Sequence, residues 1–300
     1  MGLNGGPPDP GTRTRVRRWG GLSRARDEGA LRSLTITIVS TVVFFGVVGW
    51  IVVHAPGWEQ VREAFFSGRF FVEAFGFVDG EFLWERSILR AFVVNVQLFL
   101  LAEVLILVLG LAIAVLRSLR GPVFFPLRVL AVVYADVFRA IPGLLVIYLL
   151  GFGIPGLGIK GLPTGFPWAV VALTLIYSAY VSEVYRAGID SIHPSQEAAA
   201  RSLGLSRMQT LRHVILPQAV RRVIPPLLND FIGLQKDTVL VGYIGVVEIF
   251  RASQIKQSAN FNFTPYVATA LVFIILTIPL ARLTDWLVAR DRRRGEAGSR

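Results

Sequence analysis

The chain has 300 residues, of which 53% are hydrophobic and only 17% are charged, and its mean hydropathy is +0.58. A water-soluble domain carries about a quarter charged residues, so this composition excludes an ordinary soluble protein and favours a membrane protein. The formal net charge of +11 fits an anionic membrane surface better than nucleic acid at this hydropathy, so no nucleic-acid partner is expected. The absence of cysteine excludes disulfides, thiolate metal sites and a cysteine nucleophile.

The chain begins with a basic segment, residues 1–32, that carries seven arginines against three acids. This segment is rich in Gly and Pro and cannot bury a core, so we expect a disordered cytoplasmic arm. Two roles stay open for the arm: an anchor that touches anionic membrane lipids, or a regulatory tail that binds a partner.

Leu34–Val53 is the first apolar run, and it is long enough to cross a bilayer core, which needs about 20 helical residues. The run is too long for a signal peptide, and residues 54–57 offer no small-x-small cleavage site. Residues 54–87 mix aromatic side chains with six acids against three arginines, which predicts an interfacial helix on the outer surface. A role of this segment in gating the substrate stays open. Residues 33–87 are therefore interpreted as a first span followed by an external segment.

Five further apolar runs follow, at about 89–116, 123–151, 168–185, 223–249 and 266–288. Arginine is concentrated in the arm, in the turn after the second run, in residues 186–222 and in the tail 290–300. Because basic loops stay in the cytoplasm, six spans place all these segments and both chain ends inside. The predicted fold class is all-α, a polytopic membrane helical bundle of about six transmembrane helices in the plasma (inner) membrane.

Several ionisable side chains fall inside these runs, where their cost makes a functional site the default hypothesis. Glu103 lies near the middle of the second run and fits a substrate path or a structural contact equally well. Asp136 and Arg139 share a helix face, as do Glu183 and Arg186, so each pair is expected to form a local ion pair.

A second polar stretch, Lys236-Asp237-Thr238, interrupts the fifth run between prolines at 225–226 and glycines at 242 and 245. Such broken stretches are typical of solute pathways, which is the interpretation we favour. The alternative is a bent helix whose charges only satisfy backbone groups.

The sequence contains no recognisable catalytic or metal-binding set. Its three histidines have no acids at ligand spacing, and neither a P-loop nor a GxGxxG motif is present. We therefore expect no enzyme activity and no cofactor in this chain.

The loop between the fourth and fifth runs, residues 190–218, predicts a compact helical hairpin on the inner face. Ser195 is placed to cap a first short helix after Pro194, and Gly204 is placed to end it in the left-handed conformation. Ser206 can cap a second, amphipathic helix. A loop that only connected two spans would not need capping and turn residues at such defined positions. The hairpin is therefore expected to dock a cytoplasmic partner.

This loop resembles the EAA loop of ABC-transporter permease subunits, in particular of the importers of polar amino acids of the histidine, glutamine, glutamate and arginine type. The resemblance extends from about residue 95 to 288. It includes YADVFRAIP at 134–142, AYVSEVYRAGI at 179–189 and QKDTVL at 235–240, the last like the family's LKDTSL.

The resemblance implies a type I ABC importer-like (MetI-like) permease core over residues 88–289, with the first span as an added anchor. It implies that the loop's short helix couples to the ATPase through Gln196, Glu197, Ala198, Ala199, Ala200, Gly204, Leu205 and Ser206. The implied partners are a cytoplasmic ABC ATP-binding subunit dimer that binds ATP and Mg²⁺, a second permease subunit and an external solute-binding protein. ATP hydrolysis is thus assigned to a separate subunit.

Two departures from the family pattern stand out. Aligned on Gly204, the family glutamate falls at Ala198, whereas the acid here is Glu197, which turns the side chain about 100° around the helix. The residues before Pro142 are Ala140-Ile141 instead of Gly-Thr, and Val239 replaces a serine, which predicts a more apolar pathway. Two rival functions stay open: an ion- or proton-coupled secondary transporter using Glu103 and Lys236, and a membrane scaffold that anchors a cytoplasmic enzyme.

Overall fold

The computed structural model describes residues 20–119, 121–159 and 163–297, and it gives side chains within these ranges from Ser33 to Arg290. The chain forms two compact units, residues 1–61 and 62–300. Much of the predicted basic arm, residues 1–19, lies outside the described residues. Helix α1 runs Gly20–Val53, so the helix begins inside the segment expected to be disordered. The prolines of the arm all precede Gly20, and Ala and Arg, which favour helices, are frequent after it.

The first unit contains α1 and the first turn of α2, which runs Trp58–Phe65. The part of α1 from Ser33 to Val53 is apolar enough to cross a membrane, and none of its side chains is buried within the protein. This agrees with the predicted first span, because a helix that is apolar all round and unburied needs lipid around it.

The external segment, residues 54–87, was expected to form an interfacial helix, and it begins in the first unit and continues in the second. The structure has two short helices there, α2 and α3 (Gly68–Ala74), followed by a hairpin of β1 (Phe77–Val78) and β2 (Glu81–Phe82) and a 3₁₀ turn at Trp84–Arg86. Asp79 and Gly80 form the hairpin turn with positive φ angles of 49° and 85°, the type I′ pattern for which Asp-Gly is favoured. The Asp-Gly turn is the signal that the prediction of one helix overlooked.

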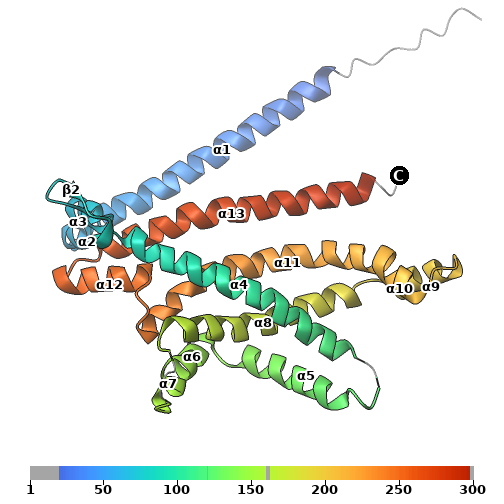
Figure 1. Cartoon of the computed structure of the whole chain (residues 1–300). Helices are drawn as coiled ribbons and strands as arrows, with labels where there is room; N and C mark the ends of the chain where they lie inside the picture. The colour runs from blue at the N-terminus through green and yellow to red at the C-terminus, as the bar shows by residue number, and fades with distance from the viewer. Residues whose placement is uncertain (1–19, 120, 160–162, 298–300) are drawn as a thin grey trace, which may run out of the picture. The chain divides into compact units, whose positions relative to one another are not determined.

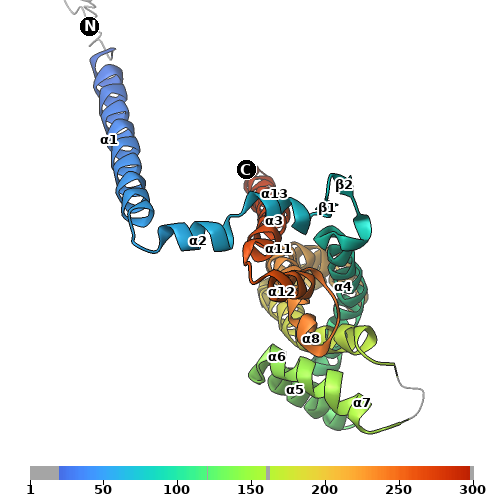
Figure 2. The same cartoon turned by 90° about the vertical axis from the view of Figure 1, so that its left-hand side faces the viewer.

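Long helices make up most of the second unit (Figures 1 and 2). They are α4 (Ile88–Ser118), α5 (Phe125–Ala140), α8 (Phe166–Asp190), α11 (Leu216–Asp237) and α13 (Thr264–Ala297). Shorter elements connect them: α6 (Gly143–Tyr148), α7 (Ile154–Gly156), α9 (Pro194–Ser202), α10 (Arg207–Thr210), α12 (Ile249–Asn260), π-helical segments at Leu149–Gly153 and Leu211–Ile215, and a 3₁₀ segment at Thr238–Ile244.

Within the described residues, four helices are long and apolar enough to span a membrane, and two bent pairs raise the count to as many as six, in agreement with the predicted number. The third predicted run is not straight: α5 and the α6–α7 pair meet at 106°. Pro142 causes this break, because the residue before a proline is pushed out of the helical region, and Ile141 has ψ 131°. The fifth run bends by 50° where α11 gives way to α12, and Gly245 there has φ +87°.

Figure 1 shows that the chain passes back and forth between two ends of the second unit. The turn between α4 and α5, the α9–α10 pair and the C-terminal part of α13 lie at one end. The β hairpin, α6–α7 and α12 lie at the other. These two groups are the segments that the arginine distribution assigned to the inner and outer faces.

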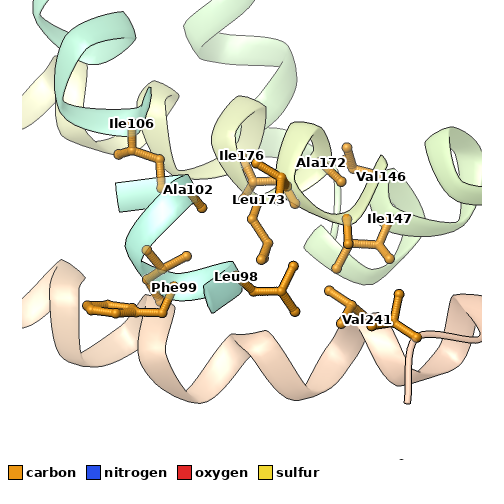
Figure 3. Close-up of a cluster of buried hydrophobic side chains, with 14 of the residues drawn as sticks. Leu98, Phe99, Ala102, Ile106, Val146, Ile147, Ala172, Leu173, Ile176 and Val241 are labelled. Atoms are coloured by element: carbon orange, nitrogen blue, oxygen red, sulfur yellow. The ribbon is translucent and has the colours of Figure 1, made fainter. Parts of the chain in front are cut away.

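The core lies where α4 and α8 pack together with α6 and the 3₁₀ segment after α11 (Figure 3). Leu98, Ile147, Leu173 and Val241 are at most 1% exposed there. Gly188 lets α8 approach α11 closely, because a Cβ at this position would lie 2.1 Å from Cγ1 of Val223. The core therefore ties the helices on both sides of the α9–α10 hairpin into one body.

Candidate functional site

The α9–α10 hairpin projects from the end of the second unit that also holds the C-terminal part of α13 (Figure 1). The predicted helix, glycine turn and second helix are all present. His193, and not Ser195, is the N-cap residue: its Nδ1 accepts from the backbone N–H of Ser195 at 3.2 Å. Pro194 occupies the first helical position, where its missing N–H costs nothing, and the cap therefore lies two residues earlier than Ser195.

Gly204 ends α9 in a Schellman motif. Its φ is +85°, its N–H donates to the carbonyl of Arg201 at 3.0 Å, and the N–H of Leu205 donates to the carbonyl of Ala200 at 3.3 Å. Ser206 then caps α10 in a capping box with Gln209, as predicted for the serine. The turn between the two helices is thus fixed by backbone and capping hydrogen bonds alone.

The residues predicted to couple to a partner are mostly exposed, but one of them is buried. Gln196, Glu197, Ala198, Ala199, Gly204 and Ser206 are exposed and Leu205 is half-buried. Ala200 is 5% exposed, so it packs inside the hairpin and positions α9 instead of offering a contact surface.

Two exposed apolar side chains of the hairpin, Leu203 and Met208, were not predicted as contact residues. Leu203 is 84% exposed, and Met208, which belongs to the apolar face of the second helix, is 70% exposed. Large apolar side chains exposed outside the membrane spans mark an interaction surface. The amphipathic pattern signalled Met208, but it could not tell an unpartnered apolar face from a buried one.

The hairpin is anchored to both neighbouring spans. The guanidinium of Arg222 in α11 donates to the carbonyl of Ser191 at the end of α8, and Gln218 donates to Gln196 at 3.5 Å. These two hydrogen bonds join α9 to α11 and α11 to the end of α8.

A cluster of charges holds three spans together at the same end of the unit. Glu183 of α8 pairs with Arg117 of α4 at 2.7 Å, with Arg139 of α5 at 3.2 Å and with Arg186 of its own helix at 2.8 Å. The local pair of Glu183 and Arg186 is confirmed. Arg139 pairs across helices with Glu183 rather than with Asp136, which is exposed, so the expected pair of Asp136 and Arg139 is wrong. The packing of α5 on α8, which a single helix pattern does not contain, decides the partner.

The polar stretch at the end of α11 joins a buried network. Thr238 accepts from the side-chain amide of Asn95 at 3.0 Å, and the same amide donates to Glu248 at 3.2 Å. Glu248 is fully buried and also accepts from the N–H groups of Phe250 and Arg251, which caps α12. Asp237 accepts from the hydroxyl of Tyr177 at 2.8 Å. The sequence identified Thr238 and Asp237, but it missed Glu248 as a cap.

Not all the charges of this stretch are in the network. Lys236 is exposed and lies beside an apolar groove lined by Phe250, Tyr266 and Phe273. Glu103 of α4 is half-buried and near enough to Asp230 of α11 for their charges to interact, while Asp230 keeps one buried carboxylate oxygen without a hydrogen bond. Across residues 20–119, 121–159 and 163–297, no group of His, Asp or Glu could hold a metal ion.

The chain resembles known transport proteins over its second unit. Residues 106–293 match the family described as binding-protein-dependent transport system inner membrane component. A probable glutamine ABC transporter permease protein, GlnM of Bacillus subtilis (strain 168), is 39% identical over 64% of this chain and 88% of the relative. The glutamate transport system permease protein GluC of Corynebacterium efficiens is 36% identical over 65% of this chain and 89% of the relative.

Solved structures show the same fold. The crystal structure of an amino acid ABC transporter with histidines matches 68% of this chain and 93% of its own, with 32% identity and a TM-score of 0.63. The inward-facing MetNI methionine ABC transporter matches with 20% identity and a TM-score of 0.55, which shows the fold alone.

Proposed function

Because the chain belongs to the family of binding-protein-dependent transport system inner membrane components, we propose that it carries a polar amino acid through the membrane as the permease subunit of an ATP-driven importer. The relatives above are named as permeases for glutamine and glutamate, which supports this solute class. ATP hydrolysis lies in a separate subunit in this family. Neither the secondary-transporter nor the scaffold alternative has support among these relatives.

The single observation that carries the coupling role is the α9–α10 hairpin, with its exposed Leu203 and Met208 and its anchors to α8 and α11. We expect the hairpin to insert these side chains into a cleft of the cytoplasmic ATP-binding subunit. Closure of the ATPase dimer would then push α8 and α11 as rigid bodies and open the path to the other side.

Binding to the ATP-binding subunit tests this proposal. Leu203→Glu places a charge at the contact, so we expect it to abolish copurification of the two subunits and ATP-dependent uptake in proteoliposomes. Leu157→Glu is the matched control, because Leu157 is 66% exposed at the opposite end of the unit. Full binding and uptake by the Leu203 variant would overturn the coupling role of the hairpin.

The solute path is proposed to run past Glu103 and Asp230, which belong to facing helices and are incompletely paired. Polar groups of this kind at membrane depth mark substrate routes. Glu103→Gln should lower uptake or change the preference among basic, neutral and acidic amino acids, with binding of the ATP-binding subunit unchanged. Unchanged uptake of every amino acid tested would show that Glu103 has only a structural role.

The remaining parts of the importer are proposed from the family. A second permease subunit, either a copy or a relative, would complete the pore, and an external binding protein would deliver the solute at the end with the β hairpin. The same orientation places both chain ends in the cytoplasm. ATP and Mg²⁺ would be bound by the partner ATPase and not by this chain.

A further inference from the structure

A cavity of about 790 Å³ is lined by the start of α4, by the turn before it and by α12. These elements lie at the end of the unit opposite the α9–α10 hairpin (Figure 1). Three basic side chains line it: Arg86, Arg90 and Lys256. Glu85 is the one acid in the lining, and it pairs with Arg90. The cavity therefore keeps an excess of positive charge.

Three basic side chains meet here against two acids, because Glu85 pairs with Arg90 and the charge of Glu73 attracts Lys256. Arg86 is close enough to Lys256 for their positive charges to repel, and Lys256 donates to the backbone carbonyl of Glu73 at 3.1 Å. Arg86 has no ion pair among the residues that the structure describes. The N-terminus of α4, a helix of 31 residues, opens on the same cavity and adds positive potential there. The net positive potential of this arrangement favours an anion in the cavity.

Apart from the polar Ser87 and Gln97, the other walls of the cavity are apolar. Trp84, Val94, Val247 and Ile255 line the cavity beside the basic groups. Trp84 lies just before the candidate span Ile88–Ser118, and tryptophan is enriched at membrane interfaces.

The cavity lies at the head of an exposed apolar stripe on α4. Arg90, Val93, Val94 and Gln97 line the cavity. Leu101, Val104 and Val108 follow on the same helix face, and they are 51%, 63% and 66% exposed. A ligand that fits both parts has an anionic head and a hydrocarbon tail.

We propose that this cavity binds the phosphate head group of an anionic phospholipid, with an acyl chain lying along the apolar stripe of α4. Arg86, Arg90 and Lys256 hold the phosphate, and Trp84 packs against the glycerol region. The proposal requires only that the second unit spans a bilayer, and it does not depend on which solute is carried.

Thermal unfolding of the full chain in nanodiscs tests the proposal. One set of discs contains only phosphatidylcholine, and a second set includes phosphatidylglycerol. We expect phosphatidylglycerol to raise the unfolding midpoint of the wild type, and native mass spectrometry to show retained phosphatidylglycerol. In Arg86→Gln/Arg90→Gln/Lys256→Gln, both effects should be lost, since each basic group near an anionic surface contributes about a fivefold gain in affinity.

Two variants separate charge in the cavity from general effects. Arg69→Gln removes an exposed cation at the same end of the unit but outside the cavity, and it should keep the full response. Arg86→Gln alone, at an exposed site, should weaken phosphatidylglycerol retention about fivefold even if the triple variant does not fold.

Three results would overturn the proposal. One is an equal phosphatidylglycerol response in the wild type and in the Arg86 variant. The second is an equal loss of response in the Arg69 variant. The third is stabilisation of the wild type by inorganic phosphate or by glutamine in phosphatidylcholine discs, which would assign the cavity to a dissolved anion.

Discussion

At the scale of single residues, Glu248 does more than its place in a short loop suggests. It is fully buried and accepts three hydrogen bonds, from Asn95 and from two N–H groups at the start of α12. It thereby joins α4 to the bend between α11 and α12. Few sequence rules would select it, because Glu is not a preferred N-cap residue and its partner Asn95 is distant in the chain.

Glu248→Ala should lower the free energy of unfolding by about 3 kcal/mol, because three buried donors lose their acceptor. The measurement is the thermal unfolding midpoint in detergent. Glu248→Gln keeps one acceptor oxygen and should recover part of the loss. Glu81→Ala, at an exposed position in the β hairpin, is the control and should leave the midpoint unchanged. A Glu248→Ala midpoint equal to the control would show that the network does not hold the bend.

Gly188 lies where α8 and α11 approach each other closely. Gly188→Ala should destabilise the protein by about 2 kcal/mol, because the new methyl group overlaps Val223 and overpacking must push α8 from α11. The unfolding midpoint again measures the effect. Val223→Ala in the same chain should restore most of the loss. Gly153→Ala, with open space around its added Cβ, should be neutral, and an equal loss there would point to glycine removal itself.

At the scale of elements, the capping and turn residues of the sequence predicted the hairpin well. Gly204 and Ser206 took the turn and cap positions assigned to them, because those conformations are decided by local hydrogen bonds. The breaks of the third and fifth spans were less well predicted. Pro142 indicates where the third span breaks, but the 106° angle between α5 and the α6–α7 pair depends on how α6 packs on α8.

The turn after α9 supports a prediction about coupling. Gly204→Ala should weaken binding of the ATP-binding subunit about fivefold, because an L residue at φ +85° costs about 1 kcal/mol in the native turn. Titration of the detergent-solubilised chain with that subunit measures the change. Gly158→Ala is the matched control, since Gly158 also has a positive φ of 68° and open space but lies at the other end. Equal weakening in both variants would show that the turn acts only through general stability.

At the scale of the whole molecule, hydropathy and charge predicted the spans and their alternation, because both follow from composition along the chain. They did not predict which charges meet. The pairing of Glu183 with Arg117 and Arg139 joins three helices, and Asn95 reaches Glu248 across 153 positions of sequence. Contacts of this kind depend on packing between spans, and a pattern along one helix does not contain that information.

The last prediction concerns which end of the molecule faces the cytoplasm. The chain has no cysteine, so single cysteines introduced into it can report orientation without further engineering. Leu157 and Met208 are 66% and 70% exposed at opposite ends of the second unit. In intact cells, a membrane-impermeant maleimide should label Leu157→Cys at once and Met208→Cys only after the membrane is permeabilised. The basic segments predict this outcome, because arginine-rich loops remain on the cytoplasmic side. Labelling of Met208→Cys from outside would invert the orientation and remove the α9–α10 hairpin from the compartment that holds the ATPase.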